Sequence, residues 1–227
     1  MDILLRAIHF IITAGGTREP IDEVRYIGNS STGRLGAAIA GEAVSRGHDV
    51  LFIHGSGSCI PMEHPRIARK PFVTSADLMA VLKQHVSQAE FPSVLVHAAA
   101  VADYIPEARE GKIPSEEEVL VLRLLKAEKI VDRIKTWNPA IILVKFKLES
   151  GCSRDQLVEI GVEAGKKSNA DLVVANDIRT LHGDEHPGLI IWNDGRYEAA
   201  FGKPEIASKL VKALESIIVS APRRNAE

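Results

Sequence analysis

The stretch ITAGGTREPIDEVRYIGNSSTGRLG, residues 12–36, decides the fold class because it joins a strand, a glycine-rich loop and the start of a helix. The apolar run Ala7–Thr13 predicts a buried first strand, and Gly15-Gly16 predicts a tight connection after it. Ser31 or Thr32 is expected to cap the helix that follows. This order is typical of an open α/β sheet, whose ligands bind beyond the carboxyl ends of the strands.

Short apolar runs alternate with helical periodicity along the rest of the chain. Further strands are expected at 49–54, 66–73, 93–97, 119–125, 140–147 and 172–175, and helices after Ser75 and over 153–168 and 204–219. The turn Asn193-Asp194-Gly195 predicts a hairpin between 189–192 and 196–201. The fold class is therefore α/β, a Rossmann-like three-layer fold with a mainly parallel sheet, plus a flap and a short β-hairpin.

The composition limits the partners that the protein can bind. The chain of 227 residues carries 28 Lys and Arg against 30 Asp and Glu, a formal net charge of -2. This balance provides no broad cationic face, so a nucleic acid is not expected as a partner. The apolar stretch 3–13 is interrupted by Arg6 and His9 and is too short to span a bilayer, so no membrane is expected as a partner either. Cys59 and Cys152 form no CxxC pair, which argues against a zinc or disulfide framework and favours a cytoplasmic location. A single domain over 1–220 with a mobile tail, 221–227, is the simplest organisation.

Two glycine-containing segments after the first strand are candidates for binding an anion. Gly15-Gly16 permits close approach of the backbone to a ligand, although such a pair is also common in plain turns. The segment YIGNSSTGRLG, residues 26–36, adds hydroxyl and amide groups at a helix N-terminus, where the helix dipole favours negative charge. Ser31 and Thr32 fit a capping role as well as a ligand contact. Asn29 both donates and accepts hydrogen bonds, which suits an acyl group that changes partner.

The segment HAAAVADY, residues 97–104, leaves the fourth strand. Its small residues allow a flat ligand to lie against the backbone, and close packing is the plainer explanation for them. Asp103 is placed to accept a hydrogen bond from a ribose or a base, or to cap a turn. The next stretch, EGKIPS at 110–115, contains Gly and Pro and indicates an exposed flap. A lone lysine in a flap is usually a solvated charge, but Lys112 follows the candidate binding strand closely enough to swing over it.

Two later segments have plain explanations when taken singly. Phe146, in VKFKLE, suits stacking on a base, although a strand phenylalanine is more often core. Lys166 and Lys167 lie at the end of a predicted helix, where the helix dipole already favours cations. The strand that follows them ends in Asn176-Asp177. Core packing, turns and helix capping explain each segment separately, but they do not explain why all the segments occur together in this order.

That order resembles the phosphopantothenate–cysteine ligase family of coenzyme A biosynthesis. The resemblance runs from TAGGTREPID through YIGNSSTGRLG, AAAVADY, GKIPS, FKLES and DLVVANDI to IIWNDG, and covers nearly the whole chain. It implies a reaction in which the carboxylate of 4′-phosphopantothenate attacks the α-phosphate of a nucleoside triphosphate and releases pyrophosphate. The amine of L-cysteine then attacks the acyl-nucleotidylate. Alignment and charge stabilisation suffice for both steps.

The resemblance also implies roles for individual residues. Asn29 and Lys112 are the expected catalytic residues, with Asn29 holding the acyl group and Lys112 closing over the phosphates. The nucleotide is expected to contact Gly15, Gly16, His97, Ala98, Ala99, Asp103, Phe146, Lys166 and Lys167. The acyl substrate is expected to contact Asn29, Ser31, Thr32, Gly33 and Arg34. Mg²⁺ is expected to accompany the triphosphate, with no protein ligands assigned.

The chain departs from the common bacterial pattern of this family at its lysines. Lys166 and Lys167 are adjacent, where bacterial forms have lysines spaced along the helix, and the flap GKIPS, residues 111–115, replaces the frequent KIKK. The sequence FKLE, residues 146–149, is close to that of eukaryotic forms. Bacterial members of the family generally use CTP and eukaryotic members ATP. The motifs TREPIDEVRYI and DLVVANDI resemble the bacterial sequences, which favours CTP. The resemblance further implies a homodimer in which the flap and hairpin regions contribute to the interface. No decarboxylase segment precedes these motifs, so a monofunctional ligase is expected.

Two other functions remain open at this level. An NAD(P)-binding Rossmann oxidoreductase would need a clean G-x-G-x-x-G and a carboxylate at the end of the second strand, which instead ends at His54-Gly55. A non-catalytic nucleotide-binding relative would keep the fold and lose turnover; the altered lysines are compatible with it, whereas Asn29 and Lys112 argue against it.

Overall fold

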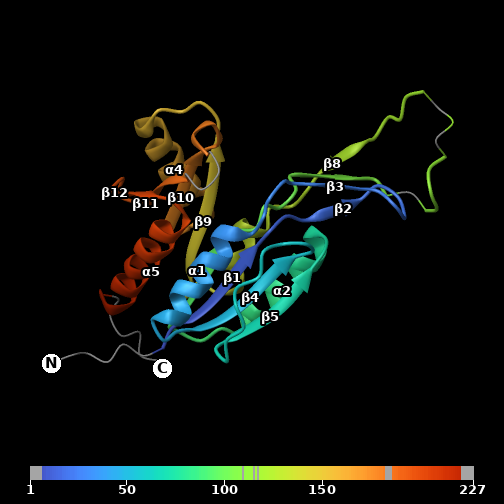
Figure 1. Ribbon diagram of the computed structural model, residues 1–227. Helices are drawn as coiled ribbons and strands as arrows, with labels where there is room; N and C mark the ends of the chain where they lie inside the picture. The colour runs from blue at the N-terminus through green and yellow to red at the C-terminus, as the bar shows by residue number, and fades with distance from the viewer. Residues whose placement is uncertain (1–6, 109, 115, 117, 182–185, 221–227) are drawn as a thin grey trace.

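The computed structural model describes residues 7–108, 110–114, 116, 118–181 and 186–220. Its centre is a sheet in the order β12-β11-β10-β9-β6-β1-β4-β5 (Figure 1). The strands are β1 (His9–Ala14), β4 (Asp49–Gly55), β5 (Ile67–Phe72), β6 (Ser93–His97), β9 (Ile142–Glu149), β10 (Leu172–Asp177), β11 (Pro187–Trp192) and β12 (Tyr197–Phe201). Six neighbouring strands of this sheet pair in parallel, in the order β5-β4-β1-β6-β9-β10. Strands β11 and β12 add an antiparallel hairpin at the β10 edge.

Helices cover both faces of this sheet, which confirms the predicted three-layer α/β fold. One face carries α1 (Arg34–Ser45) and α5 (Lys203–Ser220). The other carries α2 (Ser75–Ser87), η1 (Ile130–Arg133), α3 (Ile134–Trp137) and α4 (Arg154–Ser168), while η2 (Ile178–Thr180) follows β10. Among the described residues, no helix is both long and apolar enough to cross a membrane.

Strand β1 shows why the apolar runs become central strands. Phe10 and Ile12 pack into the core under α1 and α5, and Ile11 packs into the core under α2. All three side chains are fully buried, as expected for a parallel strand covered on both faces. Truncating Ile12 to Ala would cost about 2–5 kcal/mol because a cavity is left behind.

The helix starts differ from the sequence prediction at two places. The N-cap of α1 is Gly33, in the left-handed conformation with φ 71°, and no side chain caps the helix, so the predicted cap by Ser31 or Thr32 is wrong. Gly33 itself makes the left-handed turn into the helix, a conformation that glycine adopts without strain. The N-cap of α2 is Thr74 instead of Ser75, since Thr74 accepts from the Asp77 N–H in a capping box.

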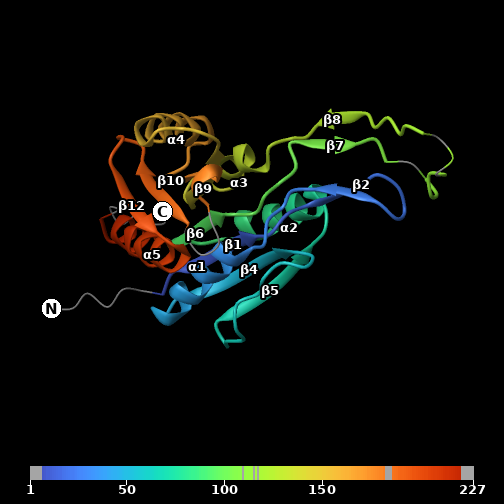
Figure 2. The same ribbon diagram turned by 45° about the horizontal axis from the view of Figure 1, so that its top comes forward.

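A two-layered arm of short strands leaves the sheet near the ends of β1 and β6. It consists of β2 (Arg18–Pro20) paired with β3 (Tyr26–Gly28), and of β7 (Tyr104–Pro106) paired with β8 (Leu124–Lys126). Both views show the arm projecting away from the helices (Figures 1 and 2). Most of the strand predicted at 119–125 is therefore wrong: Val119 and Val121 are 69% and 75% exposed, because this apolar run lies on the arm and joins no core.

The remaining boundaries follow the sequence closely. The hairpin predicted across Asn193-Asp194-Gly195 is confirmed by the antiparallel pairing of β11 with β12. Ser153 caps α4 in a capping box with Gln156, as the predicted start of that helix implies. The predicted tail, 221–227, lies outside the described residues.

Candidate active site

The glycine loop after β1 is shaped by close backbone packing. Gly15 has φ 84°, and a Cβ on it would overlap the Ser58 hydroxyl. A Cβ on Gly16 would overlap the backbone carbonyl oxygen of Asn29. The loop also exchanges backbone hydrogen bonds with Ala100, whose N–H donates to the Gly15 carbonyl over 2.8 Å. These glycines therefore hold the Asn29 loop against the carboxyl ends of β1 and β6.

Asn29 lies where these two strands end. Its side-chain amide donates to the backbone carbonyl of Val101 over 3.0 Å. This bond fixes the direction of the amide group, and the residue remains exposed at the rim of a cavity. Thr17 ties the same two segments together, because its Oγ1 accepts from the Ala102 N–H over 3.1 Å. Asn29 thus presents an oriented acceptor on a rigid support.

The N-terminus of α1 opens into a cavity of ≈ 430 Å³. The predicted site residues that line it are Ser31, Thr32, Gly33, Arg34, Ala98, Ala99 and Phe146. Because no side chain caps α1, the N–H groups of its first turn stay available to a ligand. Those donors and the helix dipole together favour a phosphate or carboxylate. Gly36 allows α1 to pack closely against the end of β1, since a Cβ on Gly36 would lie 2.7 Å from the Ala14 Cβ.

A second, more polar cavity of ≈ 610 Å³ adjoins the first at the base of the arm. Gly16, Asn29 and Arg34 border it, together with Arg18. The Arg18 guanidinium lies 4.8 Å from the centre of the Tyr26 ring, which orients this side chain. The two cavities share Ser30, Ser31, Thr32 and Arg34, and Asn29, which precedes these residues, lines the polar cavity alone.

His97 lies beneath the floor of the site. Its Nδ1 is 3.0 Å from Thr13 Oγ1, which accepts in turn from the Ala99 N–H over 3.1 Å. Burial, with the nearby charge of Lys145, lowers the pKa of His97 to about 4. The imidazole is therefore neutral at pH 7, and its side chain supports the Ala98–Ala99 backbone.

The flap lysine lies far out on the arm of its own chain. The Ile113 N–H donates to Asp22 Oδ2 over 3.1 Å, and the Arg25 guanidinium donates to the Ile113 carbonyl over 3.4 Å. These bonds attach the flap to the tip of the β2–β3 hairpin. Lys112 is exposed there and lines neither cavity. The catalytic role of Lys112 remains a prediction. For this role, the arm or a second copy of the chain would have to bring the lysine to one of the cavities.

Three further residues expected at the nucleotide lie outside the cavity lining. Asp103 is 67% exposed at the base of the arm and forms an ion pair of 3.3 Å with Lys129. Lys166 and Lys167 are exposed in the last turn of α4, on the face of the sheet opposite α1. Their predicted contacts with the nucleotide stay predictions.

Sequence reasoning missed several residues that the fold brings to the cavity. Lys147, Asn176, His186 and Lys203 all line it. Asn176 belongs to the quoted motif DLVVANDI, so its place at a strand end was a usable signal. His186 and Lys203 stand in no motif, and only the pairing of β11 with β12 carries them to this edge. Burial, with the charge of Lys203, lowers the pKa of His186.

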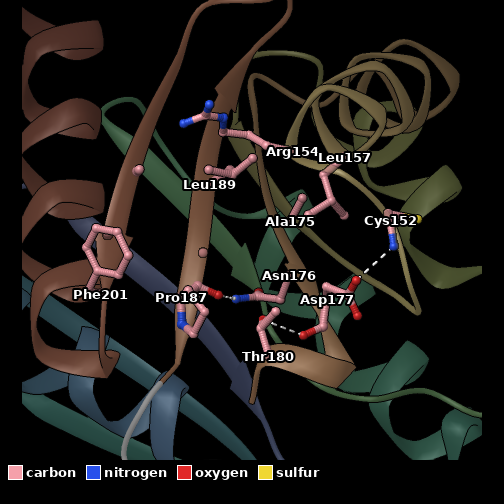
Figure 3. A pocket seen from close by; sticks show the side chains of 13 residues that line it. Cys152, Arg154, Leu157, Ala175, Asn176, Asp177, Thr180, Pro187, Leu189 and Phe201 are labelled. Atoms are coloured by element: carbon pink, nitrogen blue, oxygen red, sulfur yellow. Dashed lines mark hydrogen bonds between the residues drawn. The ribbon is translucent and has the colours of Figure 1, made fainter. Parts of the chain in front are cut away.

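A third pocket, of ≈ 370 Å³, lies on the other face of the sheet between α4 and the edge hairpin (Figure 3). Leu157 and Leu189 give it an apolar lining. The Asp177 carboxylate accepts from the Cys152 N–H over 2.8 Å, and the Asn176 amide donates to the Pro187 carbonyl over 2.6 Å. These polar groups are engaged within the protein, so an anionic substrate fits the cavity beside α1 better.

The residues of the first two cavities offer no cage for a metal ion. Their linings contain no carboxylate, and the described residues contain no group of three or more His, Cys, Asp or Glu positioned to hold a metal. A Mg²⁺ ion at this site would take its oxygen ligands from a triphosphate and from water, a common arrangement for this ion.

The open α/β sheet, with helices on both faces, places the protein in the Rossmann-like class, and the uncapped helix N-terminus gives it a cavity suited to an anion. The chain belongs to the family described as DNA/pantothenate metabolism flavoprotein C-terminal domain, whose model matches residues 5–218. This membership confirms the resemblance to phosphopantothenate–cysteine ligases that the sequence motifs indicated.

Individual relatives agree with that membership. The coenzyme A biosynthesis bifunctional protein CoaBC of Thermococcus kodakarensis is 32% identical over 210 residues, covering 92% of this chain and 51% of the relative. The chain thus spans about half the length of the curated relatives it matches. The DNA/pantothenate metabolism flavoprotein from Streptococcus pneumoniae superposes with TM-score 0.85 and 31% identity, covering 93% and 99% of the two chains. The C-terminal domain of CoaBC gives TM-score 0.77 and 26% identity over 96% and 98%.

Proposed function

We propose that this chain is a phosphopantothenate–cysteine ligase, which joins 4′-phosphopantothenate to L-cysteine at the expense of a nucleoside triphosphate. The observation that carries the proposal is the meeting of the uncapped α1 N-terminus and the Ala98–Ala100 backbone on one cavity, with Asn29 on the rim of the adjoining cavity. Family membership supports the same reaction class. The proposal includes one ligase domain over residues 1–220.

The reaction needs alignment and charge stabilisation from these residues. In the first step a carboxylate oxygen of phosphopantothenate bonds to the α-phosphorus, and the bond to pyrophosphate breaks. In the second step the cysteine nitrogen bonds to the acyl carbon, the nucleoside monophosphate leaves and the amine loses a proton. Asn29 holds the acyl oxygen through both steps, and the N–H groups of Arg34 and Leu35 bind a substrate oxygen anion.

We further propose CTP as the triphosphate and a homodimer as the active form. Lys112 lies on the arm, away from the cavity of its own chain, and Val24, Tyr104 and Val121 expose apolar surface along that arm. A second copy packed against the arm would bury this surface and bring the partner's flap to the cavity. An isologous contact forms two such sites at once.

The direct test incubates the protein with phosphopantothenate, L-cysteine, Mg²⁺ and either CTP or ATP. Release of pyrophosphate and formation of the ligated product are measured for each nucleotide. Product with CTP at a higher kcat/KM than with ATP is the expected result. Absence of product with either nucleotide would leave a non-catalytic nucleotide-binding relative as the better reading, and preference for ATP would overturn only the choice of nucleotide.

Complementation tests whether Lys112 acts across a dimer. The Lys112→Gln and Asn29→Ala proteins, each expected to keep at most about a tenth of wild-type activity, are mixed under conditions that allow subunit exchange. If a site takes Asn29 from one chain and the flap from its partner, mixed dimers regain one intact site and the mixture recovers about a quarter of wild-type activity. Recovery of no activity, with subunit exchange verified by mass, would place both residues in the same chain's site.

A further inference from the structure

Lys145 is a partly buried lysine with no role in the proposed chemistry so far. It lies on β9, in register with His97 at the end of β6. Its Nζ donates to the Ala164 carbonyl over 3.3 Å and to the Ser168 hydroxyl over 3.4 Å, both on α4. These two bonds are long for an ammonium group, which has three N–H donors. The contacts with α4 therefore orient the Lys145 side chain but leave hydrogen-bonding capacity of its ammonium group unused.

The charges around Lys145 leave its ammonium without an ion pair. Within the described part of the chain, no carboxylate oxygen lies within salt-bridge distance of it. Neighbouring lysines differ in this respect: Lys147 pairs with Glu149 over 2.6 Å, and Lys129 pairs with Asp103 over 3.3 Å. Burial lowers the pKa of Lys145, and the charge of Asp132 only partly opposes this effect. A desolvated cation of this kind is costly unless an anion accompanies it.

Lys145 lies on the α4 face of the sheet, close in sequence and register to residues that line the cavity beside α1. Ala98–Ala100, just beyond the end of β6, line the cavity beside α1, whereas His97 pairs with Lys145 on the α4 side. Helix α4 packs against η1 here, and Figure 2 shows α3, the continuation of η1, beside α4. The charge of Lys167, at the end of α4, also acts on Lys145. Phe146, which follows Lys145 on β9, lines that cavity, so Lys145 lies one residue from its lining.

We propose that the Lys145 ammonium, held beside the last turns of α4, binds a phosphate group of the nucleoside triphosphate. The inference rests on the proposed function, since it assigns a contact to that function's nucleotide. The phosphate oxygen supplies the acceptor that Lys145 lacks, and the bonds to Ala164 and Ser168 hold the ammonium in place beforehand. A purely structural role, in which Lys145 only anchors the last turn of α4, makes different predictions.

The first experiment measures binding of CTP and of ATP to the Lys145→Met protein by calorimetry. Loss of a charge-assisted hydrogen bond is expected to weaken triphosphate binding by about 10- to 100-fold. In the ligase assay the KM for the triphosphate rises by a similar factor, while the KM values for phosphopantothenate and cysteine change little. Unaltered triphosphate affinity in a folded Lys145→Met protein overturns the proposal.

Two controls separate a contact with phosphate from an effect on the fold. Lys83→Met removes an exposed lysine on α2 and is expected to bind nucleotide like wild type. Ser168→Ala removes one bond to Lys145 and keeps its charge, so it should lose less affinity than Lys145→Met. Equal losses of affinity and of Tm in Ser168→Ala and Lys145→Met would assign Lys145 to anchoring alone. A loss seen with cytidine or adenosine but not with inorganic pyrophosphate would also overturn the phosphate contact.

A measurement on the wild-type protein covers the case in which Lys145→Met does not fold. Amine acetylation is followed residue by residue by mass spectrometry, with and without saturating CTP or ATP. Lys145 is expected to be protected by the triphosphate, whereas Lys83 reacts equally in both samples. Equal labelling of Lys145 with and without bound triphosphate would contradict the inference. Because this readout and the calorimetry need no turnover, they remain decisive even if the ligase assay yields no product.

Discussion

The cavity beside α1 and the arm formed by β2, β3, β7 and β8 differ in how far the rest of the chain supports them. Around the cavity, neighbouring atoms approach so closely that Gly16 and Gly36 have no room for a side chain. Along the arm, Tyr26, Tyr104 and Val121 are 53%, 55% and 75% exposed, and short antiparallel pairs are the main support. Such a surface gains little from its own packing.

This difference suggests a division of labour between the two regions. The cavity beside α1 and the polar cavity that adjoins it present groups whose directions are fixed, such as the Asn29 amide bonded to the Val101 carbonyl. The arm carries Lys112, a flexible cation on a segment attached mainly through Asp22 and Arg25. The cavity region would fix the orientation of the substrates, and the arm would supply a positive charge that can change position. Each prediction below alters one region and leaves the other intact.

The largest effect is expected for Lys112→Gln. Loss of a cation that stabilises charge developing on the phosphates should lower kcat by about 100-fold or more. Tm should hardly change, because an exposed side chain contributes little to folding. Pyrophosphate release and thermal unfolding measure the two quantities. Lys126→Gln, which removes another arm lysine from β8, is the matched control and should keep wild-type activity. Wild-type turnover in Lys112→Gln would break the assignment of chemistry to the arm.

A smaller loss is expected for Asn29→Ala in the cavity. Removal of one oriented polar contact to the acyl group should lower kcat/KM by about 10- to 100-fold. The Val101 carbonyl loses a partner near solvent, so the Tm should fall only slightly. Steady-state kinetics with phosphopantothenate as the varied substrate checks the prediction. If kinetics remain unchanged, Asn29 is only a turn residue that closes the loop on β6.

Gly16→Ala tests whether the cavity is rigid. The added Cβ meets the Asn29 carbonyl oxygen, so the loop must shift at a cost of about 1–3 kcal/mol. Gly41→Ala is the matched control, because a Cβ at this position in α1 meets nothing within 4 Å. The control should stabilise the protein by about 0.5–1 kcal/mol. Urea unfolding measures both, and equal stabilities would show that the Asn29 loop yields easily.

The sequence specified the cavity better than the arm, for a physical reason. Apolar runs such as Phe10–Ile12 are buried on both faces, so their pattern predicts a central strand directly. The run at 119–125 is just as apolar, and its exposure depends on a surface outside the sheet. No property of these residues by themselves distinguishes a core strand from an arm that exposes apolar side chains.

The candidate site shows the same limit. Asn29, Arg34 and Ala98 were found because each lies next to a strand end or helix start recognisable in the sequence. His186 and Lys203 reach the cavity only through the edge hairpin, which no local pattern links to β1. The cap of α1 was predicted wrongly because a Ser-Thr pair fits a capping role, whereas Gly33 makes the turn and leaves the first N–H groups open.

The smallest expected effect concerns Asp22, which attaches the flap to the arm. The N–H groups of Val24, Arg25 and Ile113, with the Arg25 guanidinium, hold the pKa of Asp22 below its ordinary value of 3.8. A carboxylate with a depressed folded pKa stabilises the fold fully above its unfolded pKa. This contribution disappears as the pH falls through the folded pKa. Wild type should therefore be more stable than Asp22→Asn from pH 7 to about pH 5, and the difference should shrink at lower pH.

Urea unfolding of the two proteins across this range measures the difference, and Glu23→Gln is the control because its exposed side chain lies next to Asp22 on the same turn. Asp22→Asn should also lower kcat, since a looser flap places Lys112 less often over its target, while substrate KM values stay the same. A constant stability difference between pH 7 and pH 3 would mean that the Asp22 charge does not hold the arm. The attachment of Lys112 would then depend on the backbone pairing of β2 with β3 and of β7 with β8.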